Sequence, residues 1–592
     1  MKILLHNPLL AELAQIILKS LSQLYGDKFP ETPDNLEQII NKFSRPPDFK
    51  LGHFAFPCFF LSKQVGKAPA LIGQELAAQL ENNRPELLAQ ISHQGPYINF
   101  YFSTARMGKL ALEKIENGEY FKTPLIQQAP KLMVEYSQPN THKELHVGHM
   151  RNLCLGNALV RLLRYTGHET IAATFPGDVG THVAKCLWYY RHKNPGNPPV
   201  SHKGAWLGEL YSKANNLLED EKGSAQEEKN RLELTQILKQ LESRQGEYYE
   251  LWKETREWSI ALMQEVYSWA NIHFDKWYWE SEFDSPSLQL AREYYRQGFY
   301  IESEGAIGMD LGQDGLGFCM TIKSDGTGLY ATKDIMLAQK KFNDFKLDKS
   351  IYVVDKRQAH HFKQVFKVLE KVGFEHAKDC YHLQYDFVEL PDGPMSSRKG
   401  NIVPLMELVE KMQNKIKGDY LEKYRTEWSD QEIDDCAKIV AEGAIKYGMI
   451  RMDNSRKIVF DMNEWLKLDG ETGPYLQYVH ARIRSLCDKQ GYKHASKRDW
   501  SLLTHPAEQA VVVHLTMFNN VMLDAALQSK TPLACAYLYD LAKLFNSFYA
   551  ECSIAKAGSE EVKNVRLALS YCVGESMKKG LEILGIEAPE KM

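Results

Sequence analysis

The sequence lacks several features that would assign it to a specialised class of protein. It has no run approaching 18 apolar residues, which argues against a membrane-spanning helix. Its ten cysteines form no CxxC pair, so neither a zinc site nor a disulfide framework is indicated. Scattered cysteines are typical of reduced, buried thiols, and we expect a cytoplasmic protein. The formal net charge is only −4, so any nucleic acid must be bound by local basic patches.

The N-terminal stretch MKILLHNPLLAELAQIIL also lacks the features of a signal peptide. Its apolar residues are interrupted by polar ones, it has one basic residue, and no small-residue cleavage site follows. Leu10, Leu13, Ile17 and Leu24 recur at helical spacing and share one face. The segment is therefore predicted to be an amphipathic helix, with no membrane anchor.

The 592 residues are enough for roughly three or four domains of about 150 residues each. Helical and alternating patterns mix in residues 1–120, which predicts a small N-terminal α+β domain. Residues 121–425 are expected to form an α/β domain with a helical insertion at about 190–325. Strand patterns are lost after about residue 425, and the three/four spacing of apolar residues predicts an all-helical domain over 426–592.

The middle region carries the pattern of a parallel sheet. LMVEYS (132–137) and IAATF (171–175) are candidate buried strands, and a helical segment at 152–167 lies between them. Strand, helix and strand in this order form a βαβ unit, so the fold class is α/β. IYVVD (351–355) supplies a further strand to the same sheet.

Two histidines and a glycine open the first helix of that unit, in ELHVGHMR (144–151). Three roles are compatible with them: capping or core packing, a metal site that includes His142 and Cys154, or contact with a phosphate chain. No carboxylate stands at the H-E-x-x-H position, which disfavours a metal. A helix start after a buried strand suits an anion, because it offers free N–H groups and a positive dipole.

A second stretch, DGPMSSRKGN (392–401), combines small residues with two cations. Alone it is compatible with a solvated basic turn. Together with the histidine stretch, at the other end of the α/β region, it is typical of a clamp over a triphosphate.

These two stretches resemble the signature motifs of class I aminoacyl-tRNA synthetases, and the whole chain resembles the arginyl-tRNA synthetases. The resemblance is carried by VEYSQPNTHKELHVGHMRN (134–152), GDVGTH (177–182), LYATKDI (329–335), GAIKY (443–447), FDMNEWLKLDGETGPYLQYVHARIRS (460–485) and the ending LGIEAPEKM. It implies that residues 121–425 form a Rossmann-like catalytic domain, which activates L-arginine with ATP and transfers it to the terminal adenosine of tRNA(Arg).

The resemblance implies roles for both motifs. His146, His149 and Lys399 would be catalytic, acting by positioning and charge neutralisation rather than as nucleophiles. Mg²⁺ would arrive bound to ATP, with no dedicated protein metal site. The residues implied in ATP binding are His146, Gly148, His149, Met395, Ser396, Ser397, Arg398 and Lys399.

The family's arginine contacts correspond to Glu135, Asn140, Tyr330, Asp334 and Gln358. A guanidinium presents five donors in a planar fork, which acids and a neutral acceptor satisfy. Lysine bound as a substrate in place of arginine would leave those acceptors unpaired, and comparable polar sites discriminate against such a substrate by roughly 10⁴-fold.

For tRNA, the resemblance implies that the N-terminal domain touches the tRNA elbow and the C-terminal domain reads the anticodon. Tyr478 and Arg482 are the candidate contacts, by stacking and edge hydrogen bonds. Aromatic residues at helical spacing are also compatible with simple core packing. We further expect a monomer whose activation step depends on tRNA.

Four residues depart from the family pattern: Pro394 replaces a lysine, Arg398 replaces the last serine of the second motif, and Val179 and His182 replace tryptophan and glutamine in a GDWGTQ-like segment. Other interpretations remain at this point. A cysteine enzyme would need zinc ligands, and a glutamate enzyme would need arginines at Glu135 and Asp334. A non-catalytic tRNA-binding paralogue need not keep both histidines, and a small-molecule nucleotidyltransferase needs no long helical domain.

Overall fold

The N-terminal region of the computed structural model is an α+β unit. The structure describes residues 7–46, 51–122, 124–126, 128–193, 196–391, 404–495 and 497–592. Asn7 caps the first helix, and its side chain accepts hydrogen bonds from the N–H groups of Leu9 and Leu10. An antiparallel sheet of order β1-β3-β2 packs beside the helices. The elements are α1 (Pro8–Tyr25), α2 (Pro33–Ile40), β1 (Phe54–Pro57), α3 (Ser62–Val65), α4 (Pro69–Asn82), β2 (Leu88–Gln94), β3 (Tyr97–Phe102), α5 (Thr104–Met107) and α6 (Glu113–Glu116).

A five-stranded sheet of order β11-β10-β4-β5-β6 forms the centre of the molecule, and every pair in it is parallel. Its order reverses at β4, so the chain leaves this strand toward β5 on one side and later returns as β10 on the other. Ligands bind at such a switch point, beyond the carboxyl ends of the strands. The strands are β4 (Leu132–Glu135), β5 (Thr170–Thr174), β6 (Lys276–Trp277), β10 (Lys349–Asp355) and β11 (Cys380–Tyr385).

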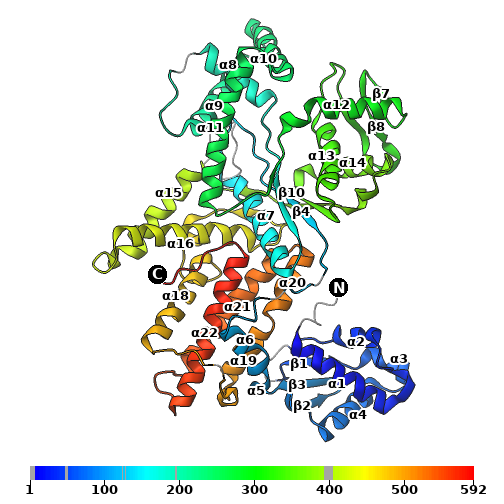
Figure 1. The fold of residues 1–592 in the computed structure, drawn as a ribbon, viewed down its shortest axis with the longest axis vertical. Coiled ribbons are helices and arrows are strands. Elements are labelled where there is room, and N and C mark those ends of the chain that lie inside the picture. Colours follow the sequence, from blue (N-terminus) through cyan, green and yellow to red (C-terminus); the bar gives the residue numbers. More distant parts are fainter. Residues whose placement is uncertain are drawn as a thin grey trace.

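Alternate residues of the strands fill two different cores. Val134 and Ile351 face the core that contains α7 (Val147–Thr166) and the C-terminal helices. Met133 and Tyr352 face the other core, which contains α12 (Glu280–Arg296), α13 (Tyr330–Phe345) and α14 (Ala359–Lys371). Helices therefore cover both faces of the sheet, as Figure 1 shows.

The region expected to be a helical insertion, about 190–325, is mostly helical, but it also contains a small antiparallel sheet. Helices α8 (Thr181–His192), α9 (Lys203–Asp220), α10 (Ala225–Ser243) and α11 (Glu247–Trp269) stand off the sheet around a small core of their own. After α11 the chain returns to the sheet as β6. An antiparallel sheet of β7 (Ile301–Ser303), β8 (Ala306–Leu311) and β9 (Gly317–Ile322) then follows α12. Strand β7 is exposed throughout, and β8 and β9 mix buried with exposed positions, so these short strands lack the continuous burial of the central strands.

The C-terminal region is helical, with one exception to the expected loss of strands: β13 (Ile458–Val459) pairs with β12 (Val388–Glu389). The α/β class, the N-terminal α+β unit and the helical C-terminal region are thus confirmed. The helices are α15 (Leu405–Ile416), α16 (Asp430–Ile450), α17 (Met462–Trp465), α18 (Gly473–Lys489), α19 (Pro506–Thr516), α20 (Phe518–Gln528), α21 (Thr531–Glu551) and α22 (Glu560–Ile583).

The N-terminal region docks on these helices through buried polar contacts. Glu116, which is 4% exposed, accepts hydrogen bonds from Arg498 and from the Tyr492 hydroxyl. Asn7 donates to the carbonyl of Thr516. Within the described residues no single helix is long and apolar enough to cross a membrane, and only α19 and α20 together, with a 43° bend between them, reach that length and composition.

Candidate functional site

The two signature histidines form the N-terminal cap of α7, at the carboxyl edge of the sheet. His146 is the N-cap residue, and its Nδ1 accepts a hydrogen bond from the N–H of Gly148 at 3.0 Å. The Nδ1 of His149 accepts from the N–H of His146 at 3.1 Å, and the two rings lie 4.0 Å apart. Because each Nδ1 is an acceptor, the proton of each neutral ring resides on Nε2, on the far side from the helix backbone.

The environment keeps both rings neutral. Burial, followed by the charge of Lys143, lowers the pKa of His146 to about 4. Burial and the neighbouring His146 hold the pKa of His149 well below its usual value. At neutral pH the start of α7 therefore presents two uncharged imidazole N–H donors at the positive end of the helix dipole. Such a group of donors is suited to phosphate oxygens.

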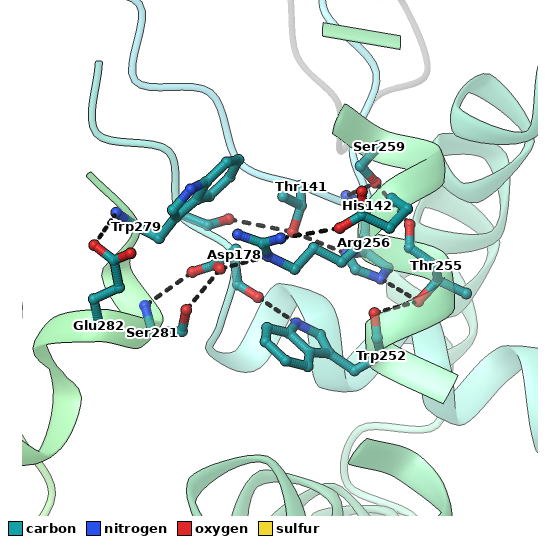
Figure 2. A network of polar contacts seen from close by, with 12 residues as sticks. Thr141, His142, Asp178, Trp252, Thr255, Arg256, Ser259, Trp279, Ser281 and Glu282 are labelled. Carbon is teal, nitrogen blue, oxygen red and sulfur yellow. Dashed lines mark hydrogen bonds and ion pairs between the residues drawn. The ribbon is translucent and has the colours of Figure 1, made fainter. Parts of the chain in front are cut away.

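His142, a potential metal ligand in the sequence, is a structural residue. Its backbone has φ 58°, its ring bonds to the hydroxyls of Thr141 at 2.9 Å and Thr255 at 2.8 Å, and its N–H donates to Ser259. These contacts fix the loop before the signature motif to helix α11 (Figure 2). No group of three or more potential metal ligands occurs in the parts of the chain that the structure describes.

A second polar network in Figure 2 is centred on Asp178, in the loop after β5. Its fully buried carboxylate accepts from the Arg256 Nε at 2.8 Å and from the N–H and hydroxyl of Ser281 at 2.9 and 2.8 Å. The Arg256 guanidinium also lies 4.0 Å from the centre of the Trp279 ring. The network ties α11, the loop after β5 and the start of α12 into one unit.

Asn140 lies against this loop. It forms a parallel bridge with Gly177, and a Cβ at Gly177 would come within 2.4 Å of the Asn140 Oδ1. Only glycine therefore fits there without displacing the asparagine. His182 donates from Nε2 to the carbonyl of Gly177 at 3.2 Å, and burial lowers the pKa of His182 to about 3. The replacement at position 182 thus supports the loop, and Val179 packs in the core of the insertion.

Glu135 ends β4 but differs from the open acid that its expected role suggested. Its Oε2 is bonded to the Nζ of Lys341, whose side chain is fully buried, and its Oε1 accepts from Gln138 at 3.2 Å. The Lys341 ammonium also lies 4.0 Å from the centre of the Tyr352 ring. Both oxygens of Glu135 are therefore engaged within the protein.

Asp334 and Tyr330 share one face at the start of α13, as their spacing of four predicted. Tyr330 is 63% exposed, whereas the Asp334 side chain is 20% exposed and its Oδ2 lies 2.6 Å from the Nε2 of His361. Gln358 is exposed at the N-cap of α14, the helix that carries His361. Of the five expected arginine contacts, Tyr330 and Gln358 are exposed, Asp334 is partly exposed, and Glu135 is buried.

The sequence reasoning did not include Glu280, the first residue of α12. It is buried beside Gly177, 3.4 Å from the Lys333 Nζ, and burial is the main cause that raises its pKa to about 7. Lys333 also pairs with Asp284. Glu280 stands next to a serine in a segment with no recognised motif, so only its position after a short strand could have indicated a role.

The other phosphate motif, Met395, Ser396, Ser397, Arg398 and Lys399, lies outside the described residues, as does Pro394. The described chain resumes at Pro404, which forms a bridge with His146, and Leu405 donates to the carbonyl of Leu145 at 3.0 Å. The described end of this segment is thus directly beside the signature histidines.

The expected tRNA contacts form an exposed stripe on α18. Tyr478 is 37% exposed, Arg482 is exposed one turn later, and the Arg482 guanidinium lies 4.6 Å from the centre of the Tyr549 ring. His480 is buried and bonds to the carbonyl of Pro589. The stripe therefore offers stacking surfaces and a cation at the surface, while the other side of the helix packs in the core.

Comparisons with known proteins agree along the whole chain. A family model described as tRNA synthetases class I (R), catalytic domain, matches residues 115–462, an arginyl tRNA synthetase N terminal domain matches 11–102, and a DALR anticodon binding domain matches 476–592. An arginine–tRNA ligase of Bdellovibrio bacteriovorus is 54% identical over 97% of this chain and 98% of the relative. One of Halothermothrix orenii is 33% identical over 94% and 97%.

Solved structures give the same result. The Thermus thermophilus arginyl-tRNA synthetase superposes with a TM-score of 0.80 at 27% identity, over 98% of this chain and 99% of that one. The described fold, from the N-terminal α+β unit to the last helix, is therefore similar to that of this structure.

Proposed function

The chain belongs to the class I arginyl-tRNA synthetases and is an arginine–tRNA ligase, and from this premise we propose how its residues divide the work. In the first step the carboxylate of L-arginine attacks the α-phosphorus of ATP, which forms arginyl-adenylate and releases pyrophosphate. In the second, a hydroxyl of the 3′-terminal adenosine of tRNA(Arg) attacks the arginyl carbonyl and releases AMP.

His146, Gly148 and His149 hold the ATP phosphates in this proposal. The two neutral Nε2–H groups donate to oxygens on which charge grows during the displacement, and Gly148 has no side chain to block the approach of the phosphates. Met395, Ser396, Ser397, Arg398 and Lys399 are proposed to neutralise the departing pyrophosphate. Mg²⁺ bound to the triphosphate would supply neutralisation of its negative charge.

The guanidinium is proposed to bind Asp334. This carboxylate is accessible and keeps Oδ1 available, because the bond to His361 uses Oδ2. Tyr330 offers an exposed ring for the substrate's planar end, and Asn140 and Gln358 offer neutral amides. Glu135 contributes charge close to the strand end, although its oxygens are held by Lys341 and Gln138.

For tRNA(Arg), we propose that Tyr478 and Arg482 on α18 meet unpaired anticodon bases, supported by their exposure on one face. The N-terminal α+β unit is proposed to touch the tRNA elbow. The domains follow the bounds 1–120, 121–425 and 426–592. One chain carries both the histidine cap and Asp334, so a monomer suffices for the reaction. We propose that the enzyme works in the cytoplasm. We also propose that tRNA must be bound during the activation step.

One observation carries the proposal: an accessible acid on α13 and two neutral imidazoles on α7 come from helices that flank β4, at the switch point of the sheet. The test is ATP–pyrophosphate exchange with each amino acid, with and without tRNA. Arginine is expected to be the one amino acid that supports exchange, and it is expected to do so only when tRNA is present. Activity with a different amino acid would overturn the substrate, and arginine exchange without tRNA would overturn the tRNA dependence.

A further inference from the structure

The carboxylate proposed to bind the guanidinium already has a partner. The His361 Nε2 lies 2.6 Å from the Asp334 Oδ2, and the two side chains are 23% and 20% exposed. They come from neighbouring helices, α14 and α13, so packing of the helices fixes the contact. A histidine paired with a carboxylate is a cation whenever it is protonated, and it then occupies the place of the counter-ion that a guanidinium would supply.

Further titratable groups of the described residues lie on the elements packed against this pair. On α13, Lys333 follows Tyr330 and pairs with Glu280 and Asp284 of α12. On β11, His382 bonds to the carbonyl of Val354, and its pKa is lowered mainly by burial, so it is neutral at pH 7.

Two further acids near α14 have partners of their own. Asp355, at the end of β10, bonds to Arg357. Asp314 pairs with Lys367 and Lys371, further along α14. Each of these acids thus has its own cation, and Asp334 is the carboxylate that His361 contacts.

We propose that His361 is a positioning residue of the arginine site, which holds Asp334 in orientation and makes the capture of arginine release a proton. The inference rests on the proposed role of Asp334. Before arginine binds, protonated His361 neutralises Asp334. When the guanidinium arrives, His361 loses its Nδ1 proton to the solvent, and the neutral ring still donates from Nε2 to the Asp334 Oδ2. The Asp334 carboxylate then accepts a hydrogen bond from the imidazole at Oδ2, and its remaining lone pairs accept hydrogen bonds from the guanidinium of the substrate.

The direction of the pH dependence follows from the pair. Burial opposes the charged ring, but the bond to Asp334 and its negative charge outweigh burial, so the pKa of His361 is raised above its usual value. Below that pKa, arginine must displace a proton to bind. The KM for arginine is therefore expected to rise as pH falls, by up to about tenfold per pH unit. Glu280 also titrates near pH 7 and contributes in the same direction.

The test is the KM for arginine in tRNA charging between pH 6 and 8.5. In H361Q the amide Nε2 keeps the donor but cannot titrate, so the KM is expected to lose most of its pH dependence. H361A removes the donor, and its KM is expected to be higher at every pH. The matched control is H360Q, because His360 is exposed on the same helix, and its profile should follow the wild type. E280Q measures the share of the slope that Glu280 supplies.

Proton release is measured separately by titration calorimetry of arginine in two buffers of different ionisation enthalpy. The wild type at pH 6.5 is expected to release more protons than H361Q. Equal release, or KM profiles of H361Q and wild type that superimpose, would overturn the role of His361. The D334N variant separates the role of His361 from the binding of the guanidinium by Asp334. An unchanged KM for arginine in D334N would overturn the proposed arginine site itself.

Discussion

Replacement of Arg256 by methionine is expected to detach helix α11 from the active-site loop. Methionine keeps an unbranched apolar chain of similar reach but removes the guanidinium. The fully buried Asp178 carboxylate then keeps only the two donors of Ser281. A buried charge that has lost its counter-ion is strongly destabilising.

The magnitude follows from the contacts that are lost. The Nε–Oδ2 bond of 2.8 Å joins two charged groups, which contributes about 1.5–3 kcal/mol. The guanidinium also lies 4.0 Å from the centre of the Trp279 ring and 5.6 Å from that of Trp252, each contact contributing roughly 0.5–1 kcal/mol. Together these give about 3 kcal/mol, which is a little over a hundredfold in an opening equilibrium.

Hydrogen–deuterium exchange measures this opening locally, which matters because a chain of several domains need not unfold in one step. Amides of α11 are expected to exchange about a hundred times faster in R256M, while those of the N-terminal α+β unit keep their rates. The matched control is K253M, on the same helix: Lys253 is 48% exposed, its ion pair is with the exposed Glu250, and its ammonium lies 5.2 Å from the centre of the Tyr249 ring. Unchanged exchange of α11 in R256M, or an equal effect of K253M, would refute the reasoning.

Three further outcomes are expected. D334N should raise the KM for arginine by at least a hundredfold and reduce discrimination against lysine, and a KM within threefold of wild type would remove Asp334 from the site. Burial lowers the pKa of His142 to about 3, so the folded state excludes a proton that the unfolded chain binds below about 6.5. Stability is therefore lost as pH falls through this range, by about 2 kcal/mol at pH 5, and in urea unfolding the difference between pH 7 and pH 5 should shrink by that amount in H142N. An Ala at Gly156 would place its Cβ 2.1 Å from the Cγ of the buried Tyr136, so G156A should lower the Tm by several degrees. Gly418, with nothing within 4 Å, is the control, and a similar loss in G418A would contradict this explanation.

The sequence by itself determined the fold class and the position of the nucleotide motif. The mainly apolar segments at 132–137, 171–175 and 351–355 contain strands of one parallel sheet. A strand of such a sheet is covered on both faces, so its successive residues are mainly apolar and do not alternate with polar ones. Helix α7 begins at Val147, directly after His146, so the histidines lie at a helix start as the local pattern predicted. These features depend on neighbours a few residues apart, which a sequence displays directly.

Other parts of the fold had no such local signal. Strand β6 has two residues, and the antiparallel strands after α12 are partly exposed, so neither carries a periodic pattern long enough to distinguish it from loop. The surface of α18 is a similar case. Helical spacing separates Tyr478 from His480, but only packing against α16 and α22 decided which of them faces the solvent.

The tertiary structure alone decided how the charges of the site are paired. Glu135 meets Lys341 across 206 positions, Asp178 meets Arg256 across 78, and Asp334 meets His361 across 27. Each residue alone reads as an ordinary surface charge or cap. Their pairing depends on which helices pack on which side of the sheet, and burial then makes a partner obligatory, because an ion removed from water is stable only beside a counter-charge or hydrogen-bond donors.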